Sequence, residues 1–290
     1  MGSALTTIGL PVALGIIMFG LGLSLTLGDF ARIAKHPKAV IIALACQLIL
    51  LPAICFGLVL LFRLPPVLAV GMMLLAASPG GTTANMYSHL FRGDIALNIS
   101  LTAINSVISV VTLPLLVNLS IGYFRPGGGQ LGIEVVEALK VFAIVLIPVA
   151  LGMLVRKLRP SFADAMDKPV RIASVIILVI VIAGAVASNL KPLLDNIAAL
   201  AGITVLFCVL SLTVGFLVPR LLRVSRPQAV ASSFEIGIHN ATLAIVIAQS
   251  VLGNFEMSLP GAVYGVLMFF IAAAFGFLIA RRTVREPADA

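Results

Sequence analysis

The sequence of 290 residues contains no tryptophan, few tyrosines, and charged residues at only 10% of its positions. A soluble domain carries about 25% charged residues, so this composition excludes an ordinary soluble protein. Hydrophobic residues make up 61% of the chain. We therefore expect an all-α integral membrane protein in a lipid bilayer, because a helix satisfies its backbone hydrogen bonds internally.

Cysteine and histidine are also scarce, with three of each. The cysteines lie inside apolar stretches without the spacing of a disulfide framework or a metal site. The histidines are scattered, so no transition-metal site is expected. The net charge of +8 is interpreted as a sign of membrane orientation rather than of a nucleic-acid partner. The first apolar stretch has no preceding lysine or arginine and is too long for a signal-peptide core.

Apolar runs of about 20 residues predict membrane-spanning helices. We expect about nine, with approximate limits 4–28, 38–62, 66–90, 94–123, 132–156, 170–190, 196–222, 227–252 and 259–281. Fifteen lysines and arginines fall in the connections on one side and four on the other. The positive-inside rule assigns the fifteen to the cytoplasm. This predicts a protein of the cytoplasmic (plasma) membrane with its N-terminus outside and its C-terminus in the cytoplasm.

The order of the spans predicts an internal repeat. Spans one to four and six to nine each contain two plain helices, an interrupted helix and a long helix. We expect a single transporter unit over 1–290, with inverted repeats over about 4–123 and 170–281 and the segment 132–156 as an extra helix. Inverted repeats with broken helices at the midplane are typical of secondary transporters.

Two stretches are expected to interrupt their helices. The first is Pro79-Gly80-Gly81-Thr82-Thr83, where proline removes a backbone donor and glycine permits unusual dihedrals. The second is the stretch 235–240, which contains Gly237. The exposed ends of half-helices suit an anionic substrate and its coupling cation. A simple proline kink is the alternative for the first stretch.

Glu235 is the only acidic residue that falls well inside a predicted span. A carboxylate at that depth costs about 3 kcal/mol on insertion scales, so it needs a cation, a proton or a hydrogen-bond partner. We favour a binding site over the alternative of a structural acid capped by its neighbours.

Span four carries a polar stripe at helical spacing. Such a face must lie against protein or water, and it can also act as a packing surface between helices. We interpret its first two members as oxygen ligands and leave both roles open for the rest and for Gln47. The stripe consists of Asn98, Thr102, Asn105, Ser109 and Thr112.

The chain resembles the bile acid:sodium symporter family, and in particular its bacterial members, at residues 15–23, 35–38, 79–82 and 235–240. The resemblance runs over nearly the whole chain, in the same order. It implies a panel domain and a core domain, with two discontinuous helices crossing in the core. This chain looks like a member that lacks the first of ten helices.

The resemblance also implies site residues and the cation that they bind. It implies one or two Na⁺ ions and an anionic substrate at the crossing. The first sodium site would comprise Asn85, Asn98, Thr102 and Glu235. The second would comprise Gln47, Glu235, His239 and the carbonyl groups of Ile236 and Ile238. The substrate would lie near Gly81, Thr82, Thr83 and Asn240.

Five positions depart from the family pattern. Ala84 stands where relatives often have a serine ligand, and Asn98 stands in place of a usual serine. His239 replaces a usual glutamine, and imidazole is a poor sodium ligand that titrates near neutrality. Met268 and the residue after it, Phe269, replace polar residues that some relatives present to substrate, so a different specificity is expected.

We therefore expect a sodium-coupled symporter for a small or amphipathic organic anion, of the bile acid, pantothenate or oxo-acid class, that works by alternating access. The alternative, motivated by Ala84 and His239, is a proton-coupled or uncoupled transporter of the same fold. An arsenite-type exporter is disfavoured because no thiol lies near the first interruption. An intramembrane enzyme or a channel is a remote alternative, since no acid pair or Ser/His dyad is evident. The sequence indicates no protein partner.

Overall fold

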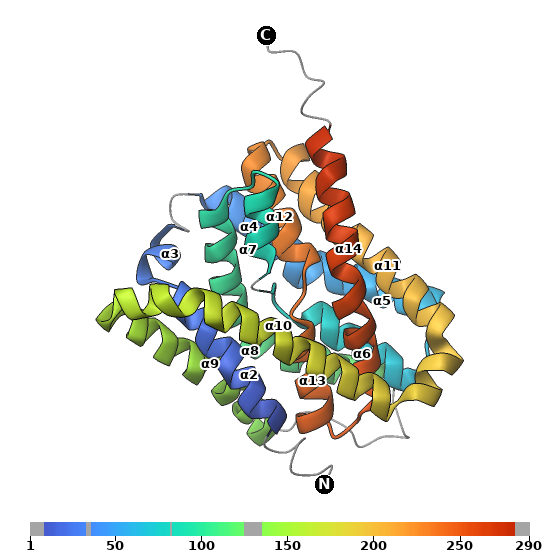
Figure 1. The fold of residues 1–290 in the computed structure, drawn as a ribbon. Helices are drawn as coiled ribbons and strands as arrows, with labels where there is room; N and C mark the ends of the chain where they lie inside the picture. The colour runs from blue at the N-terminus through green and yellow to red at the C-terminus, as the bar shows by residue number, and fades with distance from the viewer. Residues whose placement is uncertain (1–8, 33–35, 82, 125–134, 282–290) are drawn as a thin grey trace.

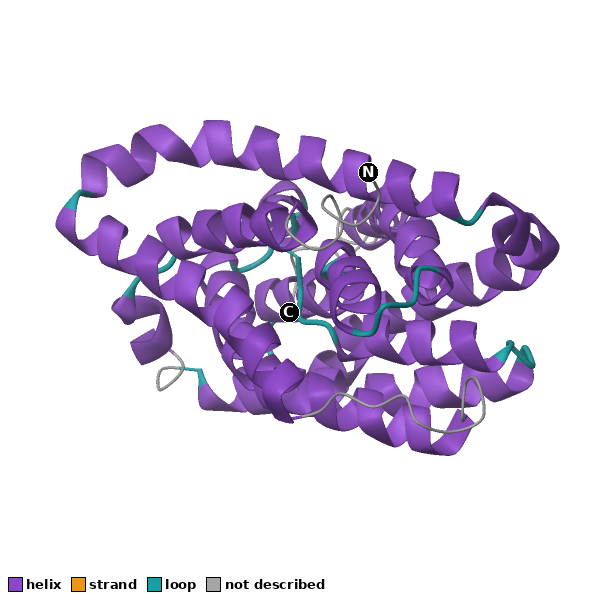
Figure 2. Ribbon diagram, turned by 90° about the horizontal axis from the view of Figure 1, so that it is seen from below, coloured by secondary structure: helices purple, strands orange, loops and turns teal. Residues whose placement is uncertain are grey.

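The computed structural model of the protein describes residues 9–32, 36–81, 83–124 and 135–281. Within these ranges the regular elements are helices, and no strand forms apart from one isolated bridge (Figure 2). Five helices are long and apolar enough to cross a membrane, which confirms the all-α membrane class. They are Pro37–Leu61, Ile95–Phe124, Pro160–Ser188, Leu190–Leu221 and Glu256–Ala280. The number of nine spans stays a prediction.

Three helices pack together as a first group, seen at the lower left of Figure 1. They are α2 (Leu10–Ser24), α9 (Val135–Leu158) and α10 (Pro160–Ser188). Gly22 and Gly152 allow α2 and α9 to touch, because a methyl group on either glycine would overlap the backbone of the other helix. Small residues at such contacts stabilise helix pairs in lipid, where no hydrophobic effect drives association.

The remaining helices apart from the short helix α3 (Leu27–Arg32) form a second group, built around contacts of α11 with α12 and α14 and of α8 with α6 and α12. Helix α3 packs on α8. The second group consists of α4 (Pro37–Ala45), η3 (Cys46–Leu50), α5 (Leu51–Leu61), α6 (Pro66–Ala77), α7 (Ala84–Leu90), α8 (Ile95–Phe124), α11 (Leu190–Leu221), α12 (Arg226–Gly237), α13 (Ala241–Val246), η5 (Ile247–Val251), η6 (Glu256–Ser258) and α14 (Leu259–Arg281).

Two predicted limits differ clearly from the structure. The predicted sixth span begins at residue 170, whereas α10 begins at Pro160, directly after α9 ends at Leu158. The predicted seventh span begins at residue 196, whereas α11 begins at Leu190. In both cases the first turns carry polar residues, so a count of apolar residues misses helix that continues beyond the apolar run.

Four helix ends share an unusual backbone. Among the described residues, φ is positive at Arg63 (50°), Arg92 (58°), Arg223 (60°) and Gly253 (62°). This left-handed conformation terminates a helix and lets later N–H groups bond to its last carbonyls. These residues follow the ends of α5, α7, α11 and η5, respectively. Each predicted interruption therefore has one such residue before it and one after it.

Candidate functional site

Two helix interruptions lie against each other near the middle of the molecule (Figure 1). The first separates α6 from α7, and the second separates α12 from α13. The Gly81 N–H donates to the Ile238 carbonyl at 2.6 Å, and the Asn240 N–H donates to the Pro79 carbonyl at 2.9 Å. The two segments therefore form a short antiparallel pair in which each satisfies backbone groups that the other leaves free.

The Glu235 carboxylate lies beside this pair and is fully buried. Thr102 Oγ1 donates to Oε2 at 2.5 Å, and Asn105 Nδ2 donates to Oε1 at 3.2 Å. Gly80 covers the carboxylate so closely that a methyl group at this position would overlap its oxygens. No lysine or arginine of the described part of the chain forms an ion pair with Glu235. The acid thus has hydrogen-bond donors but no counter-charge.

Three buried amide oxygens on α7 and α8 lack a hydrogen-bond partner among the described residues: Oδ1 of Asn85, Asn98 and Asn105. Asn98 is oriented by its nitrogen, which donates to Ser88 Oγ and to the Ala231 carbonyl, both at 2.8 Å. An unpaired buried acceptor costs about 1–3 kcal/mol. Oxygen atoms of this kind are the ligands that hard cations prefer.

Gln47 and His239 meet at one backbone carbonyl, that of Ser78. Gln47 Nε2 donates to it at 3.1 Å, and His239 Nδ1 lies 3.3 Å from it. Because a carbonyl only accepts, this contact requires a hydrogen on His239 Nδ1, and in the neutral imidazole Nε2 then keeps its lone pair. Gln47 Oε1 and His239 Nε2 are both buried and without a partner among the described residues. The His239 ring is fixed by stacking on Phe207, with centroids 5.4 Å apart.

The carbonyl groups of Ile236 and Ile238, which were predicted for the second sodium site, differ in their surroundings. Ile236 and Ile238 are both fully buried, one on each side of the end of α12. The Ile238 carbonyl already accepts a hydrogen bond from Gly81, and a carbonyl oxygen has a second lone pair to offer.

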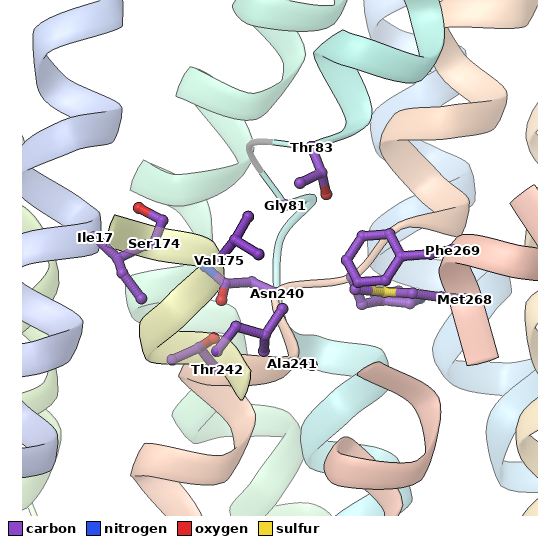
Figure 3. Close-up of a pocket in the computed structure, with 12 residues that line it drawn as sticks. Ile17, Gly81, Thr83, Ser174, Val175, Asn240, Ala241, Thr242, Met268 and Phe269 are labelled. Atoms are coloured by element: carbon purple, nitrogen blue, oxygen red, sulfur yellow. The ribbon is translucent and has the colours of Figure 1, made fainter. Parts of the chain in front are cut away.

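The residues predicted to meet substrate have mixed roles (Figure 3). Asn240 Oδ1 accepts from the Leu243 N–H at 3.0 Å and so caps α13. The Gly81 N–H is committed to Ile238. Thr83 lies beside a cavity of about 50 Å³, together with Met268 and Phe269. Thr82 lies outside the described residues.

A larger cavity of about 560 Å³ adjoins this space and has Ile17, Thr83 and Ser174 in common with it. Residues from α2, α9 and α10 form one wall, and residues from α7 and α8 form the other. Asn85 reaches this cavity from the start of α7. The cavity therefore lies between the two helix groups, and its volume is in the range of ligand-binding sites.

The sequence interpretation did not assign Asn105, Ser78 or Ser88 to the site. Asn105 follows Thr102 by three residues on the stripe of α8, and this spacing was the only available signal. Ser78 acts through its backbone carbonyl and Ser88 through a contact with Asn98. Contacts of these two kinds leave no pattern in a sequence.

A membrane protein whose described residues form helices, with a buried acid beside two helix interruptions, has the architecture of a membrane transporter. Comparison with known proteins agrees. The profile of the Sodium Bile acid symporter family matches residues 11–196. The chain belongs to this family and is a transporter rather than an enzyme.

Several relatives support this placement. The chain is 31% identical to a Bacillus subtilis protein named "Uncharacterized sodium-dependent transporter YocS", over 89% of this chain and 78% of that protein. It is 25% identical to "Probable sodium/metabolite cotransporter BASS2, chloroplastic" of Oryza sativa subsp. japonica, over 89% of this chain. This match spans only 60% of the rice protein's length. The human "Ileal sodium/bile acid cotransporter" is 24% identical, over 93% of this chain and 78% of that protein.

Proposed function

We propose that the protein is a secondary transporter that couples Na⁺ to the movement of a small or amphipathic organic anion by alternating access. The observation that carries this proposal is the fully buried Glu235 carboxylate, which accepts hydrogen bonds from Thr102 and Asn105 and forms no ion pair with a lysine or arginine of the described residues. A buried carboxylate of this kind is stabilised by a bound cation or by a proton. The names of the relatives, all of which include sodium, support Na⁺ as that cation.

Two groups of residues are the proposed sodium ligands, and Glu235 belongs to both. The first group is Asn85, Asn98, Thr102 and Glu235. The second is Gln47, Glu235, His239 and the carbonyls of Ile236 and Ile238. Orphan acceptors in both groups support the assignment, because an ion would supply the partner that the buried amide oxygens lack. Asn105 is added as a positioning residue, since it holds the carboxylate of Glu235.

The anion is proposed to bind beside the interruptions, near Gly81, Thr82, Thr83 and Asn240, and to pass through the cavity of about 560 Å³. In this view α2, α9 and α10 are the panel and the second helix group is the core. Relative rocking of the two groups would open the cavity to one side of the membrane at a time.

The proposed inverted repeat receives support from the helix ends. Arg63 and Arg223 precede the interrupted helices α6 and α12, while Arg92 and Gly253 follow α7 and η5. All four adopt the same left-handed conformation. On the proposed topology the N-terminus lies outside and the C-terminus in the cytoplasm, because fifteen of the basic residues then face inward.

A proton-coupled mechanism is the second candidate, and one observation favours it. In the second ligand group His239 Nε2 has no hydrogen-bond partner among the described residues, and imidazole binds a proton more readily than it binds Na⁺. Sodium dependence of uptake that is unchanged by removal of a pH gradient would reject this candidate.

Binding of radiolabelled Na⁺ to the purified protein tests the proposal directly. Glu235→Gln keeps the shape of the side chain and removes its charge, so we expect saturable Na⁺ binding and Na⁺-driven anion uptake into proteoliposomes to be lost. The matched control is Glu256→Gln, at a partly exposed acid, which should bind Na⁺ like the unmodified protein. Equal Na⁺ binding by the two variants would contradict the proposal.

A further inference from the structure

An ion pair lines the large cavity at the turn between α9 and α10. Arg156 Nη1 lies 2.5 Å from Asp164 Oδ1, and both residues contribute to the cavity wall. The Arg156 side chain is 30% exposed and that of Asp164 is 67% exposed. The Arg156 side chain is thus partly enclosed, while the side chain of its partner is mostly exposed.

The rest of the cavity wall is largely apolar. It includes Ile17, Leu21, Ile95, Ile99 and Val170. Among the described residues that line the cavity, Arg156 carries the only fixed positive charge, with His89 as the other nitrogen base. An occupant with an apolar body and one anionic group would match this wall, because the body would cover the apolar side chains and the anion would need the guanidinium.

The carboxylate of Asp164 resembles the group that such an occupant would present. A guanidinium binds a carboxylate or a sulfonate through the same forked donors. An exposed ion pair contributes little to stability, and Asp164 is exposed enough to be solvated once released. A substrate carboxylate can therefore replace Asp164 at the Arg156 guanidinium without leaving a buried charge unpaired.

We infer that Arg156 is a specificity-determining residue that binds the anionic group of the substrate in the large cavity, and that Asp164 is its exchangeable partner in the empty cavity. This inference rests on the proposed function, because it assigns the charged group that an organic anion meets between the two helix groups. Arg156 lies on α9, whereas the two interruptions lie between α6 and α7 and between α12 and α13. The inference therefore assigns a substrate-binding group that does not belong to either interruption.

The inference predicts opposite effects for the two halves of the ion pair. Arg156→Gln removes the cation, and cholate binding to the purified protein should weaken about tenfold or more. Asp164→Asn removes the competitor, and cholate binding should tighten several-fold. Cholate methyl ester has the same apolar body without the charge, so its binding should be unchanged in both variants.

A second exposed ion pair supplies the matched control. Lys191 Nζ lies 2.8 Å from Asp195 Oδ2 at the start of α11, and neither residue lines the cavities described above. Lys191→Gln and Asp195→Asn should leave cholate binding unchanged. Isothermal titration calorimetry in Na⁺ buffer measures all of these affinities.

The opposite changes in cholate affinity expected for the two variants distinguish substrate recognition by Arg156 from a structural role of the ion pair. If the ion pair only clamped the turn between α9 and α10, both variants would weaken cholate binding, and this result would overturn the inference. Arg156→Gln protein that binds cholate normally would overturn it as well. If the unmodified protein binds Na⁺ but no cholate, the claim that the cavity binds an amphipathic anion would be overturned.

Radiolabelled Na⁺ binding without anion keeps the two proposals apart. All four variants should bind Na⁺ normally, because none of them changes a proposed sodium ligand. Normal Na⁺ binding with unchanged cholate affinity would remove the role of Arg156 and leave sodium coupling standing. An unmodified protein that binds no Na⁺ would instead contradict the proposed function.

Discussion

The two interruptions have different compositions and different roles in the site. The segment between α6 and α7 contains one proline and two glycines, whereas residues 238–240 between α12 and α13 contain neither. The second interruption follows the buried Glu235, and the first places the small residue Gly80 over its carboxylate. One interruption thus carries the charge, and the other supplies the space and the backbone that surround it.

The comparison also separates binding groups from structural ones. At the second interruption Asn240 caps α13 through its side chain. At the first, Thr83 precedes α7 without a side-chain cap and faces both cavities. A residue of similar polarity at each interruption therefore serves a helix end in one case and lines an open space in the other.

The largest effect is expected at Gly80. A methyl group in Gly80→Ala would overlap the Glu235 carboxylate, so Na⁺ binding should weaken by about 100-fold, the equivalent of an overpacking cost of up to about 3 kcal/mol. Gly81→Ala is the matched control, because its added methyl group would lie at ordinary contact distances of 3.4 Å or more. Similar Na⁺ affinities for the two variants would show that the first interruption does not shape the ion site.

A smaller effect is expected at Asn105, which holds the carboxylate from α8. Asn105→Ala removes a hydrogen bond to a buried charged group, which contributes about 1.5–3 kcal/mol, so Na⁺ affinity should fall by about tenfold or more. Ser109→Ala removes the next polar side chain of the stripe, whose hydroxyl bonds only to Ser106 of its own helix. Titration with radiolabelled Na⁺ should leave Ser109→Ala unchanged, and an equal loss in both variants would refute the distinction.

The smallest effect is expected at the helix caps, and it concerns stability. Asn240→Ala should lower the free energy of unfolding by about 1 kcal/mol, the usual contribution of an asparagine cap. Thr83→Ala should change this free energy much less, because Thr83 makes no capping hydrogen bond. Denaturant titration in mixed micelles measures both values. A greater loss for Thr83→Ala would reverse the roles assigned to the two helix ends.

Composition and periodicity were sufficient to predict a helical membrane protein and to direct attention to the segments that the structure interrupts. They identified Glu235 because an acid inside an apolar run stands out. They did not predict that Asn105 touches Glu235, since the spacing of the stripe says which residues share a face of α8 but not which turn meets α12. The position of Ser78 between Gln47 and His239 depends on tertiary packing and left no trace in the sequence.

The Arg156–Asp164 pair illustrates the same limit from another direction. The predicted connection ran through residue 169, so Asp164 was assigned to a loop, and the basic residues nearby were used only for orientation. In the structure α9 and α10 are joined by a single residue, Arg159. This tight turn brings the two charged groups together, and no count of apolar residues could have indicated it.

The bridge between Gly80 and His239 has a mechanical consequence. Two backbone hydrogen bonds fasten the broken segments to each other, so neither can shift alone without losing both bonds. If the core moves relative to the panel, the two interruptions are therefore expected to move together as one rigid unit.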